Sequence, residues 1–321
     1  MEQDQKHIKI ADRVSTRLKL KQLRLLVAIA HHKSILHAAR ELNMSQPAAT
    51  KLLKDLEVDF GVQLFERTNR GVNATTYGET LVRHGKLVLA QISHAAQELD
   101  DLGAGSGGRV VVGTLLAASA VLLPMTIEQV QRQRPNVSIA VKDGTNDILM
   151  PLLRAGDVDL VVGRLPEYRH REELVQEALF DEQVLVLARP GHPLCRKAEI
   201  TFLDLAAYKW IMPPPETTLR RQMDNEFLDR GFEPPVNPLE SISFLTNKAL
   251  LMSTDMLGVA PYHVIQHEIG RGDIAALPLD LKMASSPVGV THRREGGLSP
   301  AAAAFLAQLR ITAAGLQPGP A

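Results

Sequence analysis

Residues 38–57 read AARELNMSQPAATKLLKDLE, and this stretch decides the fold of the N-terminal part of the 321-residue chain. Apolar residues recur at helical spacings on both sides of the short link from Leu42 to Ser45, which predicts two amphipathic helices. The Ser45 hydroxyl can cap the second helix, and Pro47 falls in its first turn, where the missing N–H costs little. Because the link is so short, the helices must meet at a sharp angle, as in a helix-turn-helix.

The residues after this motif predict a small basic hairpin, or wing. Leu64 and Phe65 can begin a short strand, residues 69–71 (NRG) supply turn chemistry, and Val72 can begin the return strand. Residues 1–77 hold 13 Lys and Arg against 8 Asp and Glu, whereas the other residues hold 23 against 28. A basic N-terminal domain with this layout is expected to bind double-stranded DNA.

The second helix of the motif has one face that is free to contact DNA. When Ala49 and Leu53 point inward, Pro47, Lys51 and Lys54 point outward. Small side chains near the helix start can touch base edges, and lysines can reach phosphates or guanine. A solvated helix face is the alternative interpretation. From the helix face and the wing we expect the DNA-binding residues to include Gln46, Pro47, Ala48, Thr50, Lys51, Lys54, Arg67 and Arg70.

Residues 78–102 contain no proline and repeat apolar positions every seven residues, with further apolar positions four residues later. This pattern is typical of a coiled-coil seam, although an amphipathic helix that packs on its own chain is the alternative. The predicted dimerisation residues are Leu81, Val88, Ile92, Ala95, Leu99 and Leu102. Residues 103–108 (GAGSGG) precede a strand instead of following one, so they predict a hinge and not a phosphate-binding loop.

From residue 109 onward, candidate strands alternate with candidate helices, which is typical of parallel sheets covered by helices. The Pro- and Gly-containing residues 188–194 predict a crossing into a second lobe, and residues 285–287 predict the return. The expected organisation is a polar tail (1–17), a winged helix-turn-helix (18–75), a linker helix and hinge (76–107), and a two-lobed α/β effector domain like that of periplasmic binding proteins (108–321), with lobe 1 at 108–187 and 286–321 and lobe 2 at 188–285.

Ligands of open α/β sheets bind beyond the carboxyl ends of the strands, where helix N-termini offer N–H groups to anions. An arginine among hydroxyl groups fits a carboxylate or a polyhydroxylated ligand such as a sugar. Capping is the alternative role for the hydroxyl residues at helix starts, and a surface ion pair is the alternative for the arginine. The expected effector-binding residues are Ala118, Ser119, Thr145, Asn146, Arg164, Thr217, Thr218, Ser243 and Ala260.

Catalysis and metal binding find little support in the sequence. His192 and Cys195 lie close together in GHPLC, but no orienting group or oxyanion donor accompanies them. A single cysteine excludes a disulfide framework and a cysteine zinc site. His31, His32 and His37 lack metal-ligand partners of suitable type and spacing. We therefore expect no enzymatic activity, metal or cofactor.

Membrane and single-strand binding are disfavoured as well. The N-terminus lacks the apolar core of a signal peptide, and the most apolar stretch, residues 110–125, is too short and too polar to span a bilayer. Aromatic residues make up only 4% of the chain, which leaves a thin platform for stacking single-stranded bases. We expect a cytoplasmic protein with no membrane partner.

The stretch SILHAARELNMSQPAATKLLKDLEVDFGVQLFERTNRGVNATTYGE, residues 34–79, resembles the winged helix-turn-helix of LysR-type transcriptional regulators. Residues 154–164 (RAGDVDLVVGR) and 260–264 (APYHV) are also similar to that family. The resemblance implies a bacterial transcription factor that forms a homotetramer, a dimer of dimers, and binds an interrupted palindrome near a promoter. It places the DNA contacts on Ser45, Gln46, Pro47, Ala48, Thr50, Lys51, Arg67 and Arg70. It also implies a small-molecule coinducer between the effector lobes, with RNA polymerase as a candidate partner.

One departure from the family is the N-terminal tail of about 17 residues, which is longer than in most members. We expect it to be disordered, and an extra DNA-contacting arm is the alternative. The alternatives are a cytoplasmic solute-binding protein or an enzyme built on the two-lobed domain. Salt dependence separates the DNA-binding regulator from these alternatives. DNA binding through several Lys and Arg weakens steeply as the salt concentration rises, whereas binding of a sugar or an acid should not.

Overall fold

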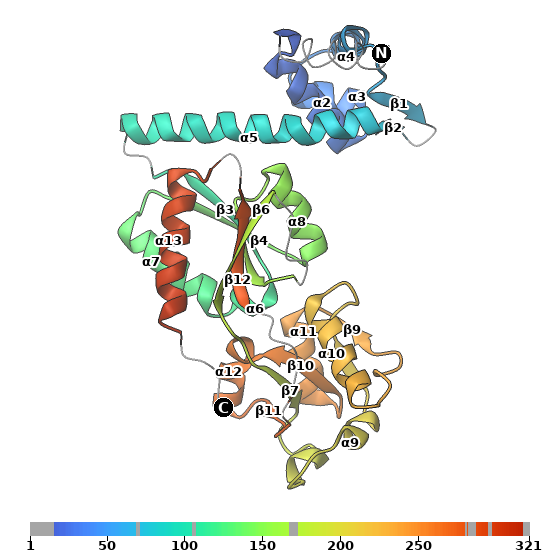
Figure 1. The fold of residues 1–321 in the computed structure, drawn as a ribbon, viewed down its shortest axis with the longest axis vertical. Helices are drawn as coiled ribbons and strands as arrows, with labels where there is room; N and C mark the ends of the chain where they lie inside the picture. Colours follow the sequence, from blue (N-terminus) through green and yellow to red (C-terminus); the bar gives the residue numbers. More distant parts are fainter. Residues whose placement is uncertain are drawn as a thin grey trace, which may run out of the picture. The chain divides into compact units, whose positions relative to one another are not determined.

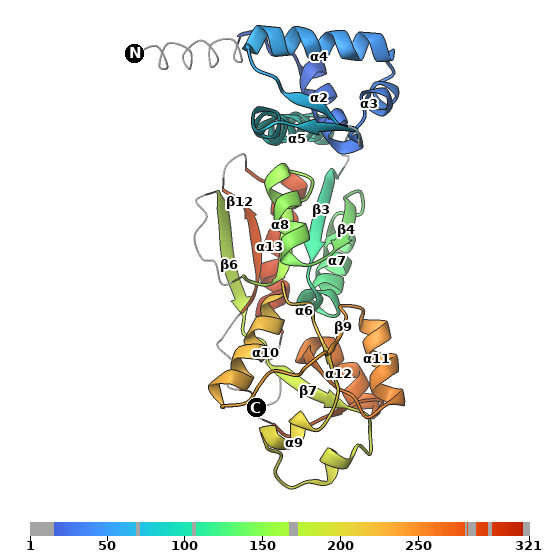
Figure 2. The same cartoon turned by 90° about the vertical axis from the view of Figure 1, so that its right-hand side faces the viewer.

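The computed structural model describes residues 16–68, 71–104, 107–166, 173–279, 281, 287–294 and 297–316. It divides the chain into two compact units (Figures 1 and 2). The first unit comprises Met1–Ala96 with Ala155–Asp157, and the second comprises Gln97–Arg154 and Val158–Ala321.

From residue 20 onward, the first unit contains three short helices, a two-stranded hairpin and the greater part of a long helix. Its core is formed by fully buried apolar side chains from all three short helices, among them Ile29, Ala38 and Leu56. Ser45 caps its helix as predicted, since its hydroxyl accepts a hydrogen bond from the Ala48 N–H. The elements are α2 (Leu20–His32), α3 (Ile35–Glu41), α4 (Gln46–Phe60), β1 (Phe65–Thr68), β2 (Gly71–Ala74) and α5 (Thr76–Ala104).

The hairpin is held against the turn that follows α2. Val72 donates its backbone N–H to the carbonyl oxygen of Lys33 at 2.9 Å. Gly71 has φ +125°, and a Cβ atom there would lie 2.7 Å from the same Lys33 oxygen. Only glycine fits this contact, so the wing is anchored to the helical core through its backbone.

The first lobe of the second unit is a five-stranded sheet in the order β4-β3-β5-β12-β6. Helices α7 and α13 cover one face, with the short α6 beside them, and α8 covers the other. The elements are β3 (Arg109–Thr114), α6 (Leu116–Ser119), α7 (Leu122–Gln133), β4 (Ser138–Asp143), α8 (Asn146–Ala155), β5 (Leu160–Arg164), β6 (Leu174–Phe180), β12 (Val288–Arg293) and α13 (Pro300–Ala314).

The second lobe is another five-stranded sheet, in the order β11-β7-β10-β8-β9. Helices α9 and α10 pack on one face of this sheet, and α11 and α12 pack on the other. The elements are β7 (Val184–Ala188), the 3-10 turn η1 (Pro193–Arg196), α9 (Phe202–Ala206), β8 (Trp210–Met212), α10 (Thr218–Asp229), β9 (Leu239–Glu240), α11 (Phe244–Ser253), β10 (Leu257–Pro261), α12 (Tyr262–Arg271) and β11 (Ala275–Ala276).

Two expectations about this domain were wrong. The sheets are mixed instead of parallel, because β12 runs antiparallel to β5 and β6, and β10 runs antiparallel to β7. The chain first crosses from lobe 1 to lobe 2 between β6 and β7, which is before the predicted crossing at residues 188–194. β7 therefore belongs to the second lobe, and that lobe does not begin at residue 188. The reason is packing: Val184 and Val186 are buried on one face of the second sheet, and Leu185 and Leu187 on the other. Of the predicted return at 285–287, only residue 287 lies among the described residues.

Candidate functional site

The first part of the candidate site is the exposed face of α4. The side chains of Lys51 and Lys54 are exposed, and no carboxylate of the described residues forms an ion pair with either. Leu53 and Leu56 are buried on the opposite face. The face combines small, polar and basic residues, with Ser45, Gln46, Pro47 and Ala48 exposed beside the lysines and Thr50 half-buried.

The wing extends the same unit beyond the helices. Its strands pair antiparallel, with Phe65 opposite Ala74 and Thr68 opposite Gly71. Arg67 lies on β1, but its side chain is outside the described residues, and Arg70 is entirely outside them. Their expected DNA contacts therefore stay predictions.

The predicted seam on α5 divides into two parts. Leu81 is half-buried and packs against the core of its own unit, as the alternative interpretation has it. Further along, Val88, Ile92 and Leu99 are exposed by 44%, 38% and 69%, and Ala95 is exposed as well. The side chain of Leu102 lies outside the described residues. The exposed apolar positions are those on which a partner helix could pack.

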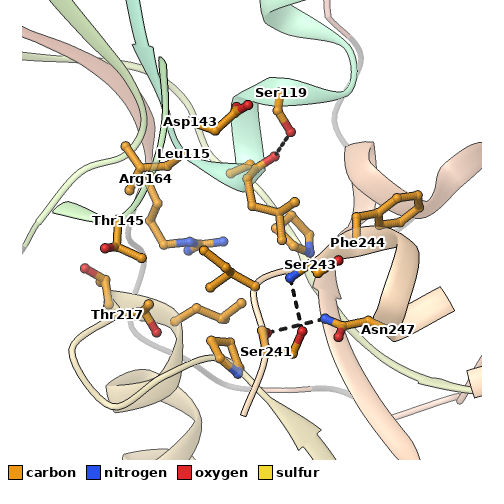
Figure 3. Close-up of a pocket in the computed structure, with 18 of the residues that line it drawn as sticks. Leu115, Ser119, Asp143, Thr145, Arg164, Thr217, Ser241, Ser243, Phe244 and Asn247 are labelled. Atoms are coloured by element: carbon orange, nitrogen blue, oxygen red, sulfur yellow. Dashed lines mark hydrogen bonds between the residues drawn. The ribbon is translucent and has the colours of Figure 1, made fainter. Parts of the chain in front are cut away.

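A cavity of about 420 Å³ is the second part of the candidate site. Both lobes of the second unit line it, and the lobe 1 residues come from the carboxyl ends of β3, β4 and β5, as the strand-end rule predicts. In Figure 3, Arg164 extends among the hydroxyl and apolar side chains that surround it. Seven of the nine expected effector-binding residues line this cavity: Ser119, Thr145, Asn146, Arg164, Thr217, Thr218 and Ser243.

The other two, Ala118 and Ala260, do not line this cavity. Ala118 is fully buried in the core of the first lobe. Ala260 lies on β10 between Val259 and Pro261, both of which line the cavity, while its own side chain packs into a core of the second lobe. For Ala260, alternation along the strand explains the difference, because successive side chains point to opposite faces.

Several lining residues were missed by the sequence reasoning. Thr114 and Asp143 are the last residues of β3 and β4, so the strand-end rule could have selected them. Ser241, Phe244 and Asn247 surround the start of α11, which follows a two-residue strand that carries no detectable sequence pattern. The Ser241 carbonyl oxygen accepts a hydrogen bond from Asn247 Nδ2 at 3.4 Å (Figure 3).

The hydroxyl groups of the cavity also cap helices, so the two interpretations are compatible. Thr217 accepts from the Arg220 N–H at 3.3 Å at the start of α10, and Ser243 accepts from the Thr246 N–H at 3.3 Å at the start of α11. The side-chain Oδ1 atoms of Asn146 and Asn247 are buried and have no hydrogen-bond partner among the described residues. These two oxygens are therefore buried acceptors without a donor among the described residues.

Arg164 dominates the electrostatics of the cavity. It is only 6% exposed, which excludes the surface ion pair considered as an alternative. Its Nη1 donates to Gln222 Oε1 at 3.5 Å. Burial lowers the pKa of Arg164, and the negative charge of Glu182 partly offsets this effect. An arginine stays protonated in proteins, so the cavity contains a buried positive charge.

The residues considered for other chemistry lie elsewhere. His192 is buried, accepts the Leu194 N–H at 3.2 Å and contacts the tilted Tyr208 ring at 4.6 Å between centroids, so it has a local structural role. Within the described ranges, no three His, Cys, Asp or Glu side chains gather closely enough to hold a metal ion. No helix in that part of the chain is both long and apolar enough to cross a membrane.

Comparison with known proteins decides the family. Residues 20–79 match the model of the bacterial regulatory helix-turn-helix protein, lysR family, and residues 103–314 match that of the LysR substrate binding domain. The chain belongs to the LysR family. This LysR-type protein is 35% identical to the HTH-type transcriptional regulator GbpR of Azospirillum brasilense over 298 residues. The aligned region covers 92% of this chain and 87% of GbpR. It is a DNA-binding transcriptional regulator with a substrate-binding domain.

Solved structures share the fold of this regulator. Full-length OxyR from Pseudomonas aeruginosa superposes with a TM-score of 0.68 at 24% identity. The superposed region covers 92% of this chain and 95% of the OxyR chain. Full-length CbnR complexed with its target DNA superposes with a TM-score of 0.65 at 20% identity. The superposed region covers 92% of this chain and 100% of the CbnR chain. The fold described above is therefore that of LysR-type regulators.

Proposed function

We propose that this regulator binds an interrupted palindrome near a bacterial promoter as a dimer of dimers, under the control of a small carboxylate coinducer in the interlobe cavity. The observation that carries the proposal is the buried cation of Arg164, lining a cavity of about 420 Å³. A volume of this size suits a small molecule. A carboxylate is the natural partner of an arginine in a water-poor site, because the two form short, charge-assisted hydrogen bonds.

The rest of the coinducer is expected to be compact, largely apolar and hydroxylated. Apolar side chains such as Leu115, Ile211 and Phe244 contribute to the lining. The hydroxyl residues of the lining, among them Thr145, Thr217 and Ser243, can exchange hydrogen bonds with hydroxyl groups of a ligand. A neutral sugar would bring no negative charge to Arg164, so a hydroxylated carboxylate fits the cavity better than a sugar.

On the DNA side, α4 enters the major groove. Gln46 and Thr50 contact base edges near the start of the helix, while Lys51 and Lys54 contact phosphates or guanine. The wing arginines contact the adjacent backbone or minor groove. Two copies of the chain join along the exposed part of α5, through Val88, Ile92, Ala95 and Leu99, and this pairing sets the spacing of the two half-sites.

The regulator is expected to act without catalysis, in the bacterial cytoplasm where promoters lie, and RNA polymerase is a candidate partner at the promoter. The first test selects genomic fragments with the purified full-length protein and footprints the fragment that is enriched most. We expect two protected half-sites beside a promoter. No enrichment over random DNA at low or moderate salt would overturn the DNA-binding part of the proposal.

The second test measures the effect of ligands on this footprint. Hydroxylated carboxylates are compared with their neutral amides, which have the same shape without the charge. We expect an acid to change the footprint in the wild type and to have no effect in Arg164→Met. Arg310→Met is the matched control, because Arg310 pairs with Glu177 on the surface and does not line the cavity. An equal response to acid and amide would contradict the carboxylate assignment.

A further inference from the structure

The cavity of the second unit contains one acidic side chain as well as one basic side chain. Among the described residues that line it, Asp143 has the only carboxylate and Arg164 has the only cationic group. Asp143 is exposed, and within the described ranges its carboxylate forms no hydrogen bond or ion pair. The Asp143 carboxylate is therefore a charged acceptor that a ligand in the cavity can reach.

The register of the first sheet holds the two charged residues apart. Asp143 is the last residue of β4 and Arg164 is the last residue of β5, and β3 lies between these two strands. Thr114 of β3 pairs with Asp143 on one side and with Val162, two residues before Arg164, on the other. Two strand spacings separate the backbones of Asp143 and Arg164 by about 10 Å. Figure 3 shows the two side chains at different parts of the lobe 1 lining.

An apolar side chain lies at the end of the strand between these two residues. Leu115 directly follows β3, lines the cavity and donates its backbone N–H to the Val162 carbonyl oxygen at 2.9 Å. A Cβ atom at Gly163, where φ is +148°, would lie 2.6 Å from Leu115 Cβ, so this glycine lets Leu115 pack closely on β5. Thr114 is 2% exposed, and its hydroxyl donates to the Leu115 carbonyl oxygen at 3.2 Å. A ligand that reaches from Arg164 to Asp143 therefore crosses an apolar surface.

We propose that Asp143 selects, among the carboxylates that Arg164 binds, those with a hydroxyl group several carbons away from the carboxylate. This inference rests on the proposed function, because it takes Arg164 as the site of the ligand carboxylate. The remote hydroxyl donates to the Asp143 carboxylate, and the carbon chain between the two polar ends packs on Leu115. A hydrogen bond to a charged acceptor is among the stronger ones in proteins.

The same arrangement disfavours two related classes of acid. A 2-hydroxy acid has its hydroxyl group on the carbon next to the carboxyl group, so it cannot reach Arg164 and Asp143 together. A dicarboxylate of suitable length brings a second negative charge to Asp143, and the two like charges repel each other. Asp143 also sets the orientation of the ligand, because the carboxylate end is directed to Arg164.

Matched probes test this selection on the full-length protein. Calorimetry at neutral pH compares 5-hydroxypentanoate, pentanoate, glutarate and 2-hydroxypentanoate, which share a five-carbon chain, and the corresponding sets of four and six carbons. We expect the best ω-hydroxy acid to bind about tenfold more tightly than its unsubstituted acid, the scale of one hydrogen bond to a charged group. The dicarboxylate and the 2-hydroxy isomer should lack this advantage. Tighter binding of the 2-hydroxy isomer, or no binding by any member of the three sets, would overturn the inference.

Substitution of the acid then assigns the preference to Asp143. In Asp143→Ala the affinity ratio of the ω-hydroxy acid to the unsubstituted acid should fall to about one. In Asp143→Asn, which keeps the shape and removes the charge, the dicarboxylate should gain about tenfold in affinity. Asp229→Asn is the matched control, because Asp229 is an exposed aspartate at the end of α10 that does not line the cavity, and it should leave every ratio unchanged. Ratios that stay at the wild-type values in both Asp143 variants would overturn the assignment.

Failure of this inference is distinguishable from failure of the proposed function. A carboxylate that changes the DNA footprint through Arg164 but shows no dependence on Asp143 would contradict the inference and leave the proposed function intact. Acids that bind equally well to the wild type and to Arg164→Met would instead contradict the proposed function. The preference for a remote hydroxyl would then still be measurable as the ratio between 5-hydroxypentanoate and pentanoate.

Discussion

Gly78 lies against Leu64, and a Cβ atom at residue 78 would be 2.0 Å from the Leu64 carbonyl oxygen. That same oxygen accepts the backbone N–H of Thr75 at 2.9 Å. The start of α5 is thereby packed directly on the backbone that leads into the wing. A side chain at this position must push the wing and the long helix apart.

Gly78→Ala should therefore destabilise the first unit. We expect a loss of about 2 kcal/mol, the usual scale of forcing extra atoms into a packed region, in spite of the gain in helix propensity. Chemical denaturation followed by helical circular dichroism measures the effect. Gly270→Ala is the control, because Gly270 lies inside α12 and an added methyl group would meet nothing within 4 Å, so this variant should be neutral or more stable. Equal stabilities of the two variants would contradict the packing argument.

Substitutions on α4 should separate sequence recognition from general affinity. Gln46→Ala and Thr50→Ala should each reduce discrimination between operator and random DNA by about 1–3 kcal/mol, because they remove contacts to base edges. Lys54→Ala should weaken both kinds of DNA alike and reduce the salt dependence by about one phosphate contact. Binding titrations over a range of salt concentrations measure both effects. Val58→Ala, at a 70% exposed position near the end of α4, is the control. Full discrimination by the Gln46 and Thr50 variants would show that the recognition face is misplaced.

Glutamates on the exposed part of α5 should prevent dimerisation. Val88→Glu with Ile92→Glu places four like charges across a two-helix interface, so we expect the mass measured by light scattering to fall to that of the monomer at low concentration. Leu81 is a poor position for this test, because it packs in the core of its own unit. Gln91→Glu, at an exposed position outside the predicted seam, should leave the mass unchanged. An unchanged mass in the double variant would remove α5 from the interface.

Glu182 should make the stability of the second unit depend on pH. Folding raises the pKa of Glu182 above the ordinary value of 4.5. Its contribution to the free energy of unfolding is therefore complete below pH 4.5 and is lost as the pH rises through the folded-state pKa. Glu182→Gln should abolish this decline. The fluorescence of Trp210, the single tryptophan of the chain and 1% exposed, reports urea unfolding of this unit. Glu177→Gln should act in the opposite direction, because the pKa of Glu177 is lowered and its contribution is present above pH 4.5. Parallel pH profiles for the wild type and Glu182→Gln would refute this prediction.

Local patterns were sufficient to predict the first unit. The helical spacings around residues 38–57, the Ser45 cap and the turn before Val72 all act over a few residues, and the structure confirms the helices, the cap and the wing. Strand order is a different kind of information. β12 reaches the first sheet only after the whole second lobe, and nothing within its six residues indicates an antiparallel neighbour.

The cavity illustrates the same limit at the level of single side chains. The strand-end rule found Thr145 and Arg164, because carboxyl ends of strands in one sheet share an edge. It could not decide which way Ala260 points, because the answer depends on which face of β10 is covered. Sequence reasoning also missed the contact between Glu182 Oε1 and His263 Nδ1. These atoms lie 3.0 Å apart, although the two residues are 81 positions apart in the chain.

The place of β12 in the first sheet has a consequence for synthesis on the ribosome. β12 lies between β5 and β6, and its hydrogen bonds are the ones that join these two strands into one sheet. Until residues 288–293 emerge, β5 and β6 each have an unpaired edge, while the second lobe lies entirely upstream and can fold first. The nascent chain thus completes its lobes in reverse order, and a ribosome stalled before residue 288 would hold a chain with exposed, aggregation-prone strand edges.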